Sequence, residues 1–275
     1  MLNEITTSQQ IVKYNGLTFI EEEDDIAVES ALTIILDGEE FATMVCTPSK
    51  LEELVVGFLA SEGVIRVVED ILTIRIDEGT GFAYVDLVNN PSIHKNFHSK
   101  RFIGSCCGKG RQFYFHNDVM TAKTILTKLT ITPEQCNQLM KQLQESSVEF
   151  QQTGGVHNAA LCTRDGIVIS RTDIGRHNAL DKLFGYCLIH KISLKDKLLA
   201  FSGRISSEVL LKAAKIGVGI ILSKSAPTNL ALNLAEDLGI TAVGFIRGRG
   251  FNVYSHQERI QRVDCHGPLS STKSI

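Results

Sequence analysis

The sequence predicts an α/β protein in which a β-rich α+β domain, residues 1–128, precedes an α/β domain, residues 129–275. The second domain is predicted by fully apolar runs that alternate with segments whose apolar residues recur at helical spacing. Continuous apolar strands between helices are typical of a largely parallel sheet covered on both faces. The first domain is predicted by strands that alternate apolar and polar residues around one helical segment.

The first domain opens with a segment of about 20 residues that we expect to form a loosely tied arm. It leads into the acidic run 21–25, which we expect to be a solvated surface. Two β-rich runs, 32–36 and 41–46, then flank Asp37 and Gly38. Asp-Gly between such runs is typical of a tight hairpin turn, so these runs are predicted to pair.

One helix and further strands complete the first domain. Thr47 and Pro48 offer an N-cap and a first-turn proline, and apolar residues follow them at helical spacing. Residues 71–76 and 82–88 alternate apolar and polar side chains, so both are predicted strands. A further short strand is predicted at 112–115.

The second domain begins with a helix that has a clear start signal. Thr132 opens a capping box with Pro133 at the first helical position, and the helix is predicted to run to about Ser146. A hairpin is predicted next, because residues 158–162 and 167–171 are β-rich and flank a turn. Helices are then predicted from Arg176, Ser206 and Thr228, the last two ending at Gly217 and Gly239, with apolar strands at 197–201, 218–222 and 241–246. The polar tail from His256 is expected to be frayed.

Composition excludes several classes of protein. The net charge of −3 over 275 residues, 43% of them hydrophobic, excludes a globally basic nucleic-acid binder. The N-terminal residues contain no basic segment followed by an apolar one, so no signal peptide is predicted. No apolar run approaches the roughly 20 residues that a membrane span requires. We therefore expect a cytoplasmic protein whose partners are neither membranes nor nucleic acids.

Small, hydroxyl-bearing and cationic residues follow each of the last three predicted strands. The segments are 202–204, 223–228 and 247–250, and their cations are Arg204, Lys224, Arg247 and Arg249. Ligands bind at the carboxyl ends of the strands in such sheets, and two of these segments lead into helix N-termini, which favour anions. No Walker sequence is present. The pattern predicts a phosphate-bearing ligand, and the alternative is a set of ordinary polar loops.

A second polar group lies on either side of the predicted hairpin in the second domain. His157 precedes the hairpin, and Arg176 and His177 follow it at the start of a helix. Histidines and an arginine at a helix start suit anion binding or proton transfer. The alternative is that His177 only caps the helix, while Asp181 and Lys182 are solvated.

The adjacent Cys106 and Cys107 lie in a glycine-rich loop that also carries Lys109 and Arg111. Nearby cations stabilise a thiolate and lower the pKa of a cysteine, so this loop is predicted to present a nucleophile. The alternative is an incidental pair of small residues. The other cysteines are interpreted as packing residues (Cys46, Cys136, Cys162 and Cys187) or as part of the tail (Cys265). Since the chain has no Cys-x-x-Cys pair, no zinc site is predicted.

With these motifs the chain resembles the formate dehydrogenase accessory sulfurtransferase family (FdhD-type), from about residue 32 to residue 256. The resemblance is carried by segments 104–109, 153–157, 173–182, 202–206, 223–228 and 244–247. It implies a three-layer α/β/α, cytidine deaminase-like fold for the second domain. Deaminases bind zinc through His-x-Glu and Pro-Cys-x-x-Cys motifs. Here His177-Asn178-Ala179 lacks the glutamate and residues 202–208 lack cysteine, so zinc chemistry is not expected.

The resemblance implies a sulfur carrier, or sulfurtransferase, that accepts sulfane sulfur from a cysteine desulfurase as a cysteine persulfide. It would transfer this sulfur to the molybdenum cofactor, bis-molybdopterin guanine dinucleotide, which formate dehydrogenase requires. A homodimer is also implied. The expected cofactor-binding residues are Phe245, Ile246, Arg247, Gly248, Arg249 and Gly250 by motif, joined by His157, Arg176, His177, Arg204, Lys224 and Ser225.

One departure from the family leaves the carrier residue open. Many members have Cys-x-x-Cys in this loop, whereas this chain has adjacent cysteines. The Gly-Lys that follows favours Cys107, which we choose, and the preceding Ser105 favours Cys106. Two other functions are considered: a chaperone that binds the molybdenum cofactor without transferring sulfur, and a zinc-dependent nucleobase deaminase.

Overall fold

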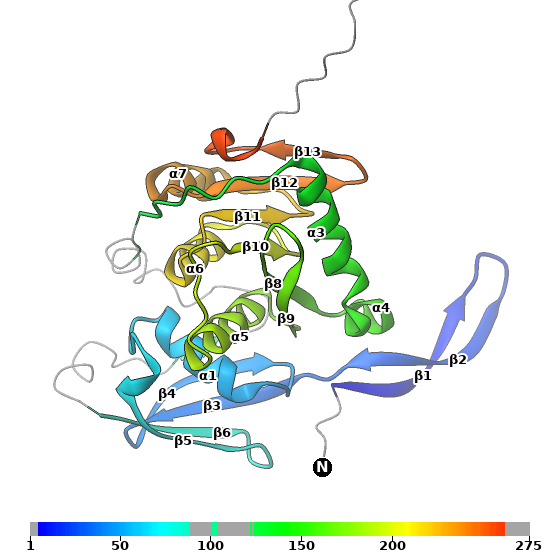
Figure 1. Cartoon of the computed structure of the whole chain (residues 1–275). Coiled ribbons are helices and arrows are strands. Elements are labelled where there is room, and N and C mark those ends of the chain that lie inside the picture. The colour runs from blue at the N-terminus through cyan, green and yellow to red at the C-terminus, as the bar shows by residue number, and fades with distance from the viewer. Residues whose placement is uncertain (1–4, 89–100, 104–121, 123, 262–275) are drawn as a thin grey trace, which may run out of the picture.

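The computed structural model describes residues 5–88, 101–103, 122 and 124–261 (Figure 1). The described residues form a two-stranded arm, a five-stranded sheet and a six-stranded sheet. The six-stranded sheet and its helices occupy the upper part of Figure 1, and the five-stranded sheet lies below them. The strand predicted at 112–115 lies outside the described residues.

The six-stranded sheet has the order β13-β12-β11-β10-β8-β9. Its strands are β8 (His157–Cys162), β9 (Ile167–Asp173), β10 (Leu198–Phe201), β11 (Ile220–Ser223), β12 (Thr241–Arg247) and β13 (Gly250–Val253). The three helix-linked strands β10, β11 and β12 are parallel, as predicted. The sheet as a whole is mixed rather than largely parallel: β8 and β9 form one antiparallel hairpin, β12 and β13 form another, and β8 is also antiparallel to β10.

Helices cover both faces of this sheet, so the predicted three-layer arrangement is present. Helix α3 (Pro133–Glu145) packs on one face, where Leu139 and Met140 meet the side chains of Ala160 and Leu222. The other face is covered by α5 (Arg176–Ile189), α6 (Ser207–Ile216) and α7 (Asn229–Leu238). The relation to cytidine deaminases in particular stays a prediction.

The predicted helix boundaries of this region follow from local hydrogen bonding. Thr132 closes the capping box of α3, its side chain accepting from the Gln135 N–H at 3.2 Å. Ser206 and Thr228 cap α6 and α7, which end at Gly217 and Gly239 in the left-handed conformation. One short helix, α4 (Val148–Thr153), was not predicted.

The five-stranded sheet has the order β5-β6-β3-β4-β7. Its strands are β3 (Ser30–Leu36), β4 (Glu39–Cys46), β5 (Ile71–Asp77), β6 (Phe82–Leu87) and β7 (Arg101–Ile103), with a 3₁₀ turn at Val68–Asp70. β3 and β4 form the predicted hairpin through Asp37 and Gly38. β7, for which no strand is predicted from the sequence, pairs parallel with β4, and Ile103 is the register partner of Met44.

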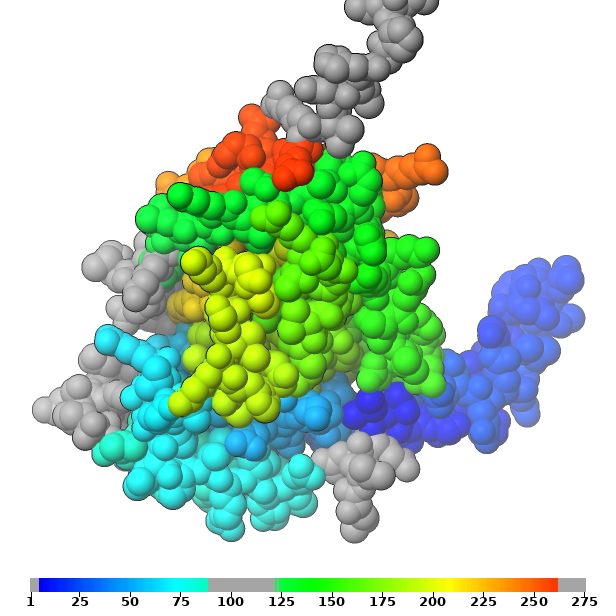
Figure 2. Space-filling model, viewed as in Figure 1, coloured from blue at the N-terminus to red at the C-terminus, as the bar shows by residue number. Residues whose placement is uncertain are grey.

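The N-terminal segment is not a loose arm but an antiparallel hairpin of β1 (Thr6–Tyr14) and β2 (Phe19–Ala27). Asn15 and Gly16 make its turn: the Asn15 side-chain oxygen accepts the N–H of Leu17 at 3.0 Å, and Gly16 has a φ of 96°. The hairpin projects from the body (Figures 1 and 2). Glu21, Glu23 and Asp24 are exposed on it, which confirms that the acidic run is solvated.

The helix of the first half starts later than predicted. Helix α1 (Leu51–Ser61) has Lys50 at its N-cap, in the left-handed conformation with a φ of 51°. Thr47 therefore does not cap it. Thr47 is 2% exposed, and its hydroxyl instead accepts the Ile174 N–H at 3.0 Å, while its backbone N–H donates to the Asp173 carboxylate at 3.1 Å. A tertiary contact takes the group that local capping was predicted to use.

Helices α1 and α5 pack closely together and join the two halves. A Cβ on Gly57 would lie 1.8 Å from the Asp181 carbonyl oxygen, and one on Gly185 would lie 1.9 Å from that of Glu53. Only glycine allows this approach. One hydrophobic core cluster includes buried residues of both halves, so the core is continuous across the predicted boundary at residue 128. The division into two domains there stays a prediction.

The start of the C-terminal tail is ordered, contrary to expectation. Residues Gln257–Arg259 form a 3₁₀ turn, and the Gln261 N–H donates to the Ile131 carbonyl at 2.9 Å. The Arg259 guanidinium donates to the Gly239 carbonyl at 2.7 Å. These bonds fasten the segment to the sheet as far as residue 261.

No helix in the described ranges has the length and apolar character needed to cross a membrane.

Candidate functional site

The polar segments singled out from the sequence meet at one edge of the six-stranded sheet. The parallel strands β10, β11 and β12 all end there. Because β8 is antiparallel to β10 and β9 to β8, the start of β8 and the end of β9 lie at the same edge, where His157 is the register partner of Asp173. We call residues 157, 174–177, 202–204, 223–225 and 245–250 the strand-end edge; the buried Asp173 lies directly before one of these segments.

Hydrogen bonds tie the loops of the strand-end edge to one another. The Ser223 hydroxyl donates to the Gly203 carbonyl at 2.7 Å, and the Ser202 hydroxyl accepts the Asn158 N–H at 2.9 Å. The Ser225 carbonyl accepts the Phe245 N–H at 3.3 Å. Three neighbouring strand ends are thus linked to each other, so this edge is built as one unit rather than as separate polar loops.

Four cations of the strand-end edge are exposed: Arg204, Lys224, Arg247 and Arg249. Within the described part of the chain, none of them forms an ion pair. Lys224 donates to the Gln144 side chain at 3.4 Å, and the Arg247 guanidinium lies 5.5 Å from the centre of the Phe245 ring. Cations without a carboxylate partner make this edge suited to an anion.

The motif stretch 245–250 divides between the edge and the core. Phe245 is 39% exposed and has a φ of 55°, and Gly248 has a φ of 60° in the turn between β12 and β13. Ile246, by contrast, is 3% exposed and packs in the core beneath the sheet. Its side chain is therefore turned away from any ligand at the edge, and only its backbone remains for binding.

His157, Arg176 and His177 line the other end of this edge. Burial lowers the pKa of His157, and the nearby Arg176 lowers it further, against the opposing effect of Asp173. The His157 imidazole is therefore held towards its neutral form. His177 lies 3.0 Å from the Glu208 carboxylate. It does not cap α5, whose N-cap is Gly175, so that alternative is wrong.

Beneath the edge lies a buried network of charged residues that is not predicted from the sequence. Asp173 and Lys182 are both 0% exposed and form an ion pair at 2.7 Å. The Asp173 carboxylate also accepts the N–H of Gly175 at 2.8 Å and the side-chain amide of Asn178 at 3.0 Å. Asp181 is 2% exposed and pairs with Lys212. The alternative that Asp181 and Lys182 are solvated is therefore wrong.

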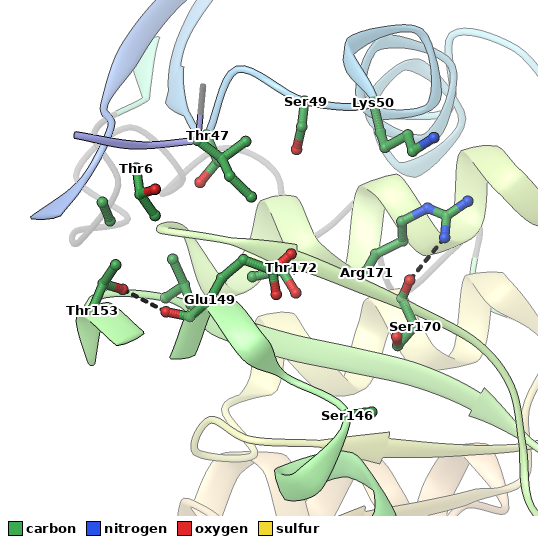
Figure 3. Close-up of a pocket in the computed structure, with 13 residues that line it drawn as sticks. Thr6, Thr47, Ser49, Lys50, Ser146, Glu149, Thr153, Ser170, Arg171 and Thr172 are labelled. Atoms are coloured by element: carbon green, nitrogen blue, oxygen red, sulfur yellow. Dashed lines mark hydrogen bonds between the residues drawn. The ribbon is translucent and has the colours of Figure 1, made fainter. Parts of the chain in front are cut away.

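A cavity of about 310 Å³ lies next to this network, between the base of the arm, the start of α1, α4 and β9 (Figure 3). Hydroxyls dominate its wall, among them those of Thr6, Thr47, Ser49 and Thr172. None of the predicted cofactor-binding residues lines it. The cavity and the strand-end edge are therefore distinct features.

The described cysteines are all buried and unpaired. Burial raises the pKa of Cys46, Cys136 and Cys162 to about 12 and that of Cys187 to about 11. Their thiols are poor nucleophiles, as expected for packing residues. The predicted carrier residues Cys106 and Cys107, together with Cys265, lie outside the described residues.

No group of three or more His, Cys, Asp or Glu side chains suited to a metal ion occurs in the described ranges. The expectation that the protein binds no zinc stays a prediction.

Comparison with known proteins identifies the chain's relatives. Residues 27–261 match the model of the FdhD/NarQ family. A protein of Geobacillus kaustophilus named sulfur carrier protein FdhD is 62% identical over 250 residues, which are 91% of this chain and 95% of that protein. The protein of the same name from Bacillus subtilis is 57% identical over 261 residues, which are 95% of this chain and all of that protein.

A solved structure shares the fold. It is the crystal structure of a protein assigned as a formate dehydrogenase accessory protein, from Desulfotalea psychrophila. The two superpose with a TM-score of 0.76 at 26% identity, over 94% of this chain and 100% of the other.

Proposed function

The chain belongs to the FdhD/NarQ family, and from that premise we propose that it is a sulfur carrier in the maturation of formate dehydrogenase. A cysteine desulfurase donates the sulfur, and Cys107, or its neighbour Cys106, carries it as a persulfide. The acceptor is the molybdenum cofactor, bis-molybdopterin guanine dinucleotide, bound at the strand-end edge. The carrier acts as a persulfide-based sulfurtransferase and as a homodimer in the cytoplasm.

Loading of the carrier is an exchange reaction between the carrier thiolate and the persulfide of the desulfurase. The carrier thiolate attacks the outer sulfur of the desulfurase persulfide, a new S–S bond forms, and the desulfurase cysteine leaves as a thiolate. Sulfane sulfur moves and no net oxidation occurs. Release of that sulfur as sulfide needs two electrons, which a second thiol supplies by attacking the persulfide and ending as a disulfide.

The observation that carries the proposal is the distribution of thiols. Four of the seven cysteines are buried, with pKa values raised to about 11 or 12, so they are unsuited to accept sulfur. Three cysteines are left, and two of them are the adjacent pair flanked by Lys109 and Arg111. This distribution supports Cys106 and Cys107 as the residues that carry the sulfur.

The path of the chain supports a short distance between carrier and edge. β7 ends at Ile103, beside Met44 of β4, and Thr47 follows β4 and donates to Asp173, which directly precedes a segment of the strand-end edge. Cys107 lies four positions after Ile103 in the sequence, and four residues of extended chain span at most about 14 Å. The described part of β7 therefore ends on the side of the five-stranded sheet from which Thr47 contacts Asp173, which supports a carrier within reach of the edge.

The strand-end edge supports the cofactor part of the proposal. A dinucleotide cofactor carries several phosphates, and Arg204, Lys224, Arg247 and Arg249 are exposed cations that can bind them. Phe245, which is exposed beside Arg247, offers an aromatic ring on which a guanine base can stack.

A mass assay tests the sulfur step. The protein is incubated with a cysteine desulfurase and cysteine, and the peptide with Cys106 and Cys107 is expected to gain about 32 Da, one sulfur atom. Cys106→Ala and Cys107→Ala, made separately and together, show which residue carries it. The matched control is Cys187→Ala, which removes a buried thiol and should leave the gain unchanged. A gain that persists in the double variant refutes the proposal.

A chaperone that holds the cofactor without transferring sulfur is the second candidate, favoured by exposed cations at the strand-end edge that can bind an anion without a cysteine. The two functions can be distinguished by expressing variants in a strain that lacks the native gene. If the Cys106→Ala/Cys107→Ala variant restores formate dehydrogenase activity, the chaperone function is sufficient. If it fails while its affinity for guanosine diphosphate is unchanged, sulfur transfer is required.

A further inference from the structure

The turn after β4 and the start of α5 are joined by a cluster of buried polar contacts centred on Asp173. Its carboxylate accepts from the Thr47 N–H at 3.1 Å, the Gly175 N–H at 2.8 Å, the Asn178 amide at 3.0 Å and the Lys182 ammonium at 2.7 Å. Four donors from three segments therefore converge on one side chain that is 0% exposed.

The contacts of Asp173 are reinforced in the same place. The Lys182 ammonium also donates to the Thr47 carbonyl at 3.0 Å, and the Thr47 hydroxyl accepts the Ile174 N–H at 3.0 Å. The Asn178 amide donates to the Val45 carbonyl at 2.8 Å. Both backbone groups and the hydroxyl of Thr47 are thus held by one short stretch of the second half.

This cluster lies between the two parts of the proposed machinery. On one side, Asp173 is the register partner of His157, and Gly175 directly precedes Arg176 at the start of α5. On the other side, Val45 belongs to β4, whose parallel neighbour β7 ends at Ile103. The cluster therefore fixes the strand-end edge relative to the strand from which the cysteine segment continues.

Stability alone is a poor reason for such a pair. Taking two charges out of water is expensive, and well-packed apolar residues in their place are often as stabilising or more so. What a buried pair with directional hydrogen bonds supplies is a unique arrangement of the segments that it joins. Here those segments belong to different halves of the molecule.

Helix α5, which carries Lys182, also carries a second buried aspartate with which Asp173 can be compared. Asp181 pairs with Lys212 and accepts the Ser61 hydroxyl at 2.6 Å, so it also joins α5 to the first half. Asp181 is 2% exposed, close to the 0% of Asp173. Asp181, however, contacts Ser61 at the end of α1, whereas Asp173 contacts Thr47, which precedes the start of that helix. The two aspartates are alike in burial and pairing and differ in their distance from the edge.

We propose that Asp173 and Lys182 are positioning residues, which hold the strand-end edge and the end of β4 in the one relative placement that sulfur transfer requires. This role rests on the proposed function. It concerns the transfer step, because both side chains are buried and neither is one of the four exposed cations. Loading of the carrier and binding of the nucleotide should therefore tolerate their loss.

The test compares Asp173→Asn with Asp181→Asn, each in the full-length protein. Three quantities are measured: the 32 Da gain from a cysteine desulfurase (about one sulfur), the affinity for guanosine diphosphate, and formate dehydrogenase activity produced per loaded carrier. For Asp173→Asn, the first two should stay within about threefold and the third should fall at least about tenfold, a loss of roughly 1.4 kcal/mol. For Asp181→Asn all three should stay within about threefold.

A purely structural role predicts a different result, because both variants would then lose all three properties in proportion to their melting temperatures. Equal transfer by the two variants overturns the positioning role and leaves the proposed function intact. A wild-type chain that never gains sulfur overturns the proposed function, and the positioning role falls with it. Should Asp173→Asn fail to fold, Asp173→Asn/Lys182→Met removes both buried charges and is expected to show the same loss of transfer.

Discussion

Both the interior and the strand-end edge contain cationic side chains, but those of the interior are paired with carboxylates and four of those at the edge are exposed. In the interior, Lys182 lies 2.7 Å from Asp173, Lys212 pairs with Asp181, and Arg171 pairs with Glu53. At the edge, the four exposed cations have no ion pair with any described residue. Because an unpaired charge is expensive to bury, the interior neutralises its cations. The four cations of the edge stay exposed and are therefore available to a ligand.

Thiol reactivity gives the largest expected contrast between the two environments. A pKa of about 12 leaves Cys46, Cys136 and Cys162 with roughly a thousandth of the thiolate that an ordinary thiol has. An alkylating reagent at pH 8 should therefore modify at most three cysteines of the native protein: Cys106, Cys107 and Cys265. Intact mass spectrometry counts the adducts, and the denatured chain, in which all seven react, is the control. Rapid modification of a fourth cysteine would contradict the contrast.

Loss of a buried cation should cost far more stability than loss of an exposed one. Lys182→Met leaves the Asp173 carboxylate buried without its ion pair, and should lower the free energy of unfolding by about 3–5 kcal/mol. The control is Lys141→Met, which breaks an exposed ion pair with Glu145 and should change stability by less than about 1 kcal/mol. Urea denaturation measures both, and similar values would remove the distinction between the two environments.

The exposed cations should matter for binding and little for folding. Arg247→Ala/Arg249→Ala should weaken binding of guanosine diphosphate by about 10- to 100-fold, the range for charge-assisted hydrogen bonds. The melting temperature should barely change, because both side chains are exposed and neither forms an ion pair with a described residue. Lys195→Ala, which removes an exposed cation before the start of β10, is the control. Calorimetry measures both the affinity and the melting temperature. An unchanged affinity for guanosine diphosphate in the double variant would refute the anion site.

The smallest effect is expected at His157, which lies between the two environments. Its pKa is lowered in the fold by burial and by Arg176, so the folded state disfavours the charged form. A depressed pKa stabilises the fold above the unfolded value of 6.5, and this stability is lost as the pH falls through the folded value. The slope from one proton is at most about 1.4 kcal/mol per pH unit.

A variant isolates that contribution. His157→Gln should show a weaker decline in stability than the wild type between pH 7.5 and pH 5.5, in urea denaturation at each pH. If the two curves run parallel, His157 is not held in its neutral form.

Much of the second half could be predicted because its signals are local. The capping box at Thr132 and the glycines that end α6 and α7 act through hydrogen bonds within a few residues. The strand-end cations could be predicted to converge because parallel strands must end at one edge. The arm hairpin was missed although Asn15-Gly16 is a turn signal. Its strands are exposed on both faces and lack the alternation that marks a half-buried strand.

The errors at Thr47 and Lys182 have a common cause. Thr47 has the sequence of a helix cap, and Lys182 has that of a solvated side chain, yet both are buried against Asp173. Their partners are 126 and nine residues away, and no local pattern encodes which polar residue a fold will enclose. Only the packing of α1 on α5, through Gly57 and Gly185, brings them together.

By itself, the sequence determined the order of helices and strands, the edge at which cations gather, and the cysteine pair to which the family's chemistry points. These follow from periodicity, capping and motif, which act over short distances. The tertiary structure decided which polar groups are buried, which thiols are made unreactive by burial, and how the two halves are held together. Those outcomes depend on burial, which raises the cost of an unpaired charge and is set only when distant segments pack.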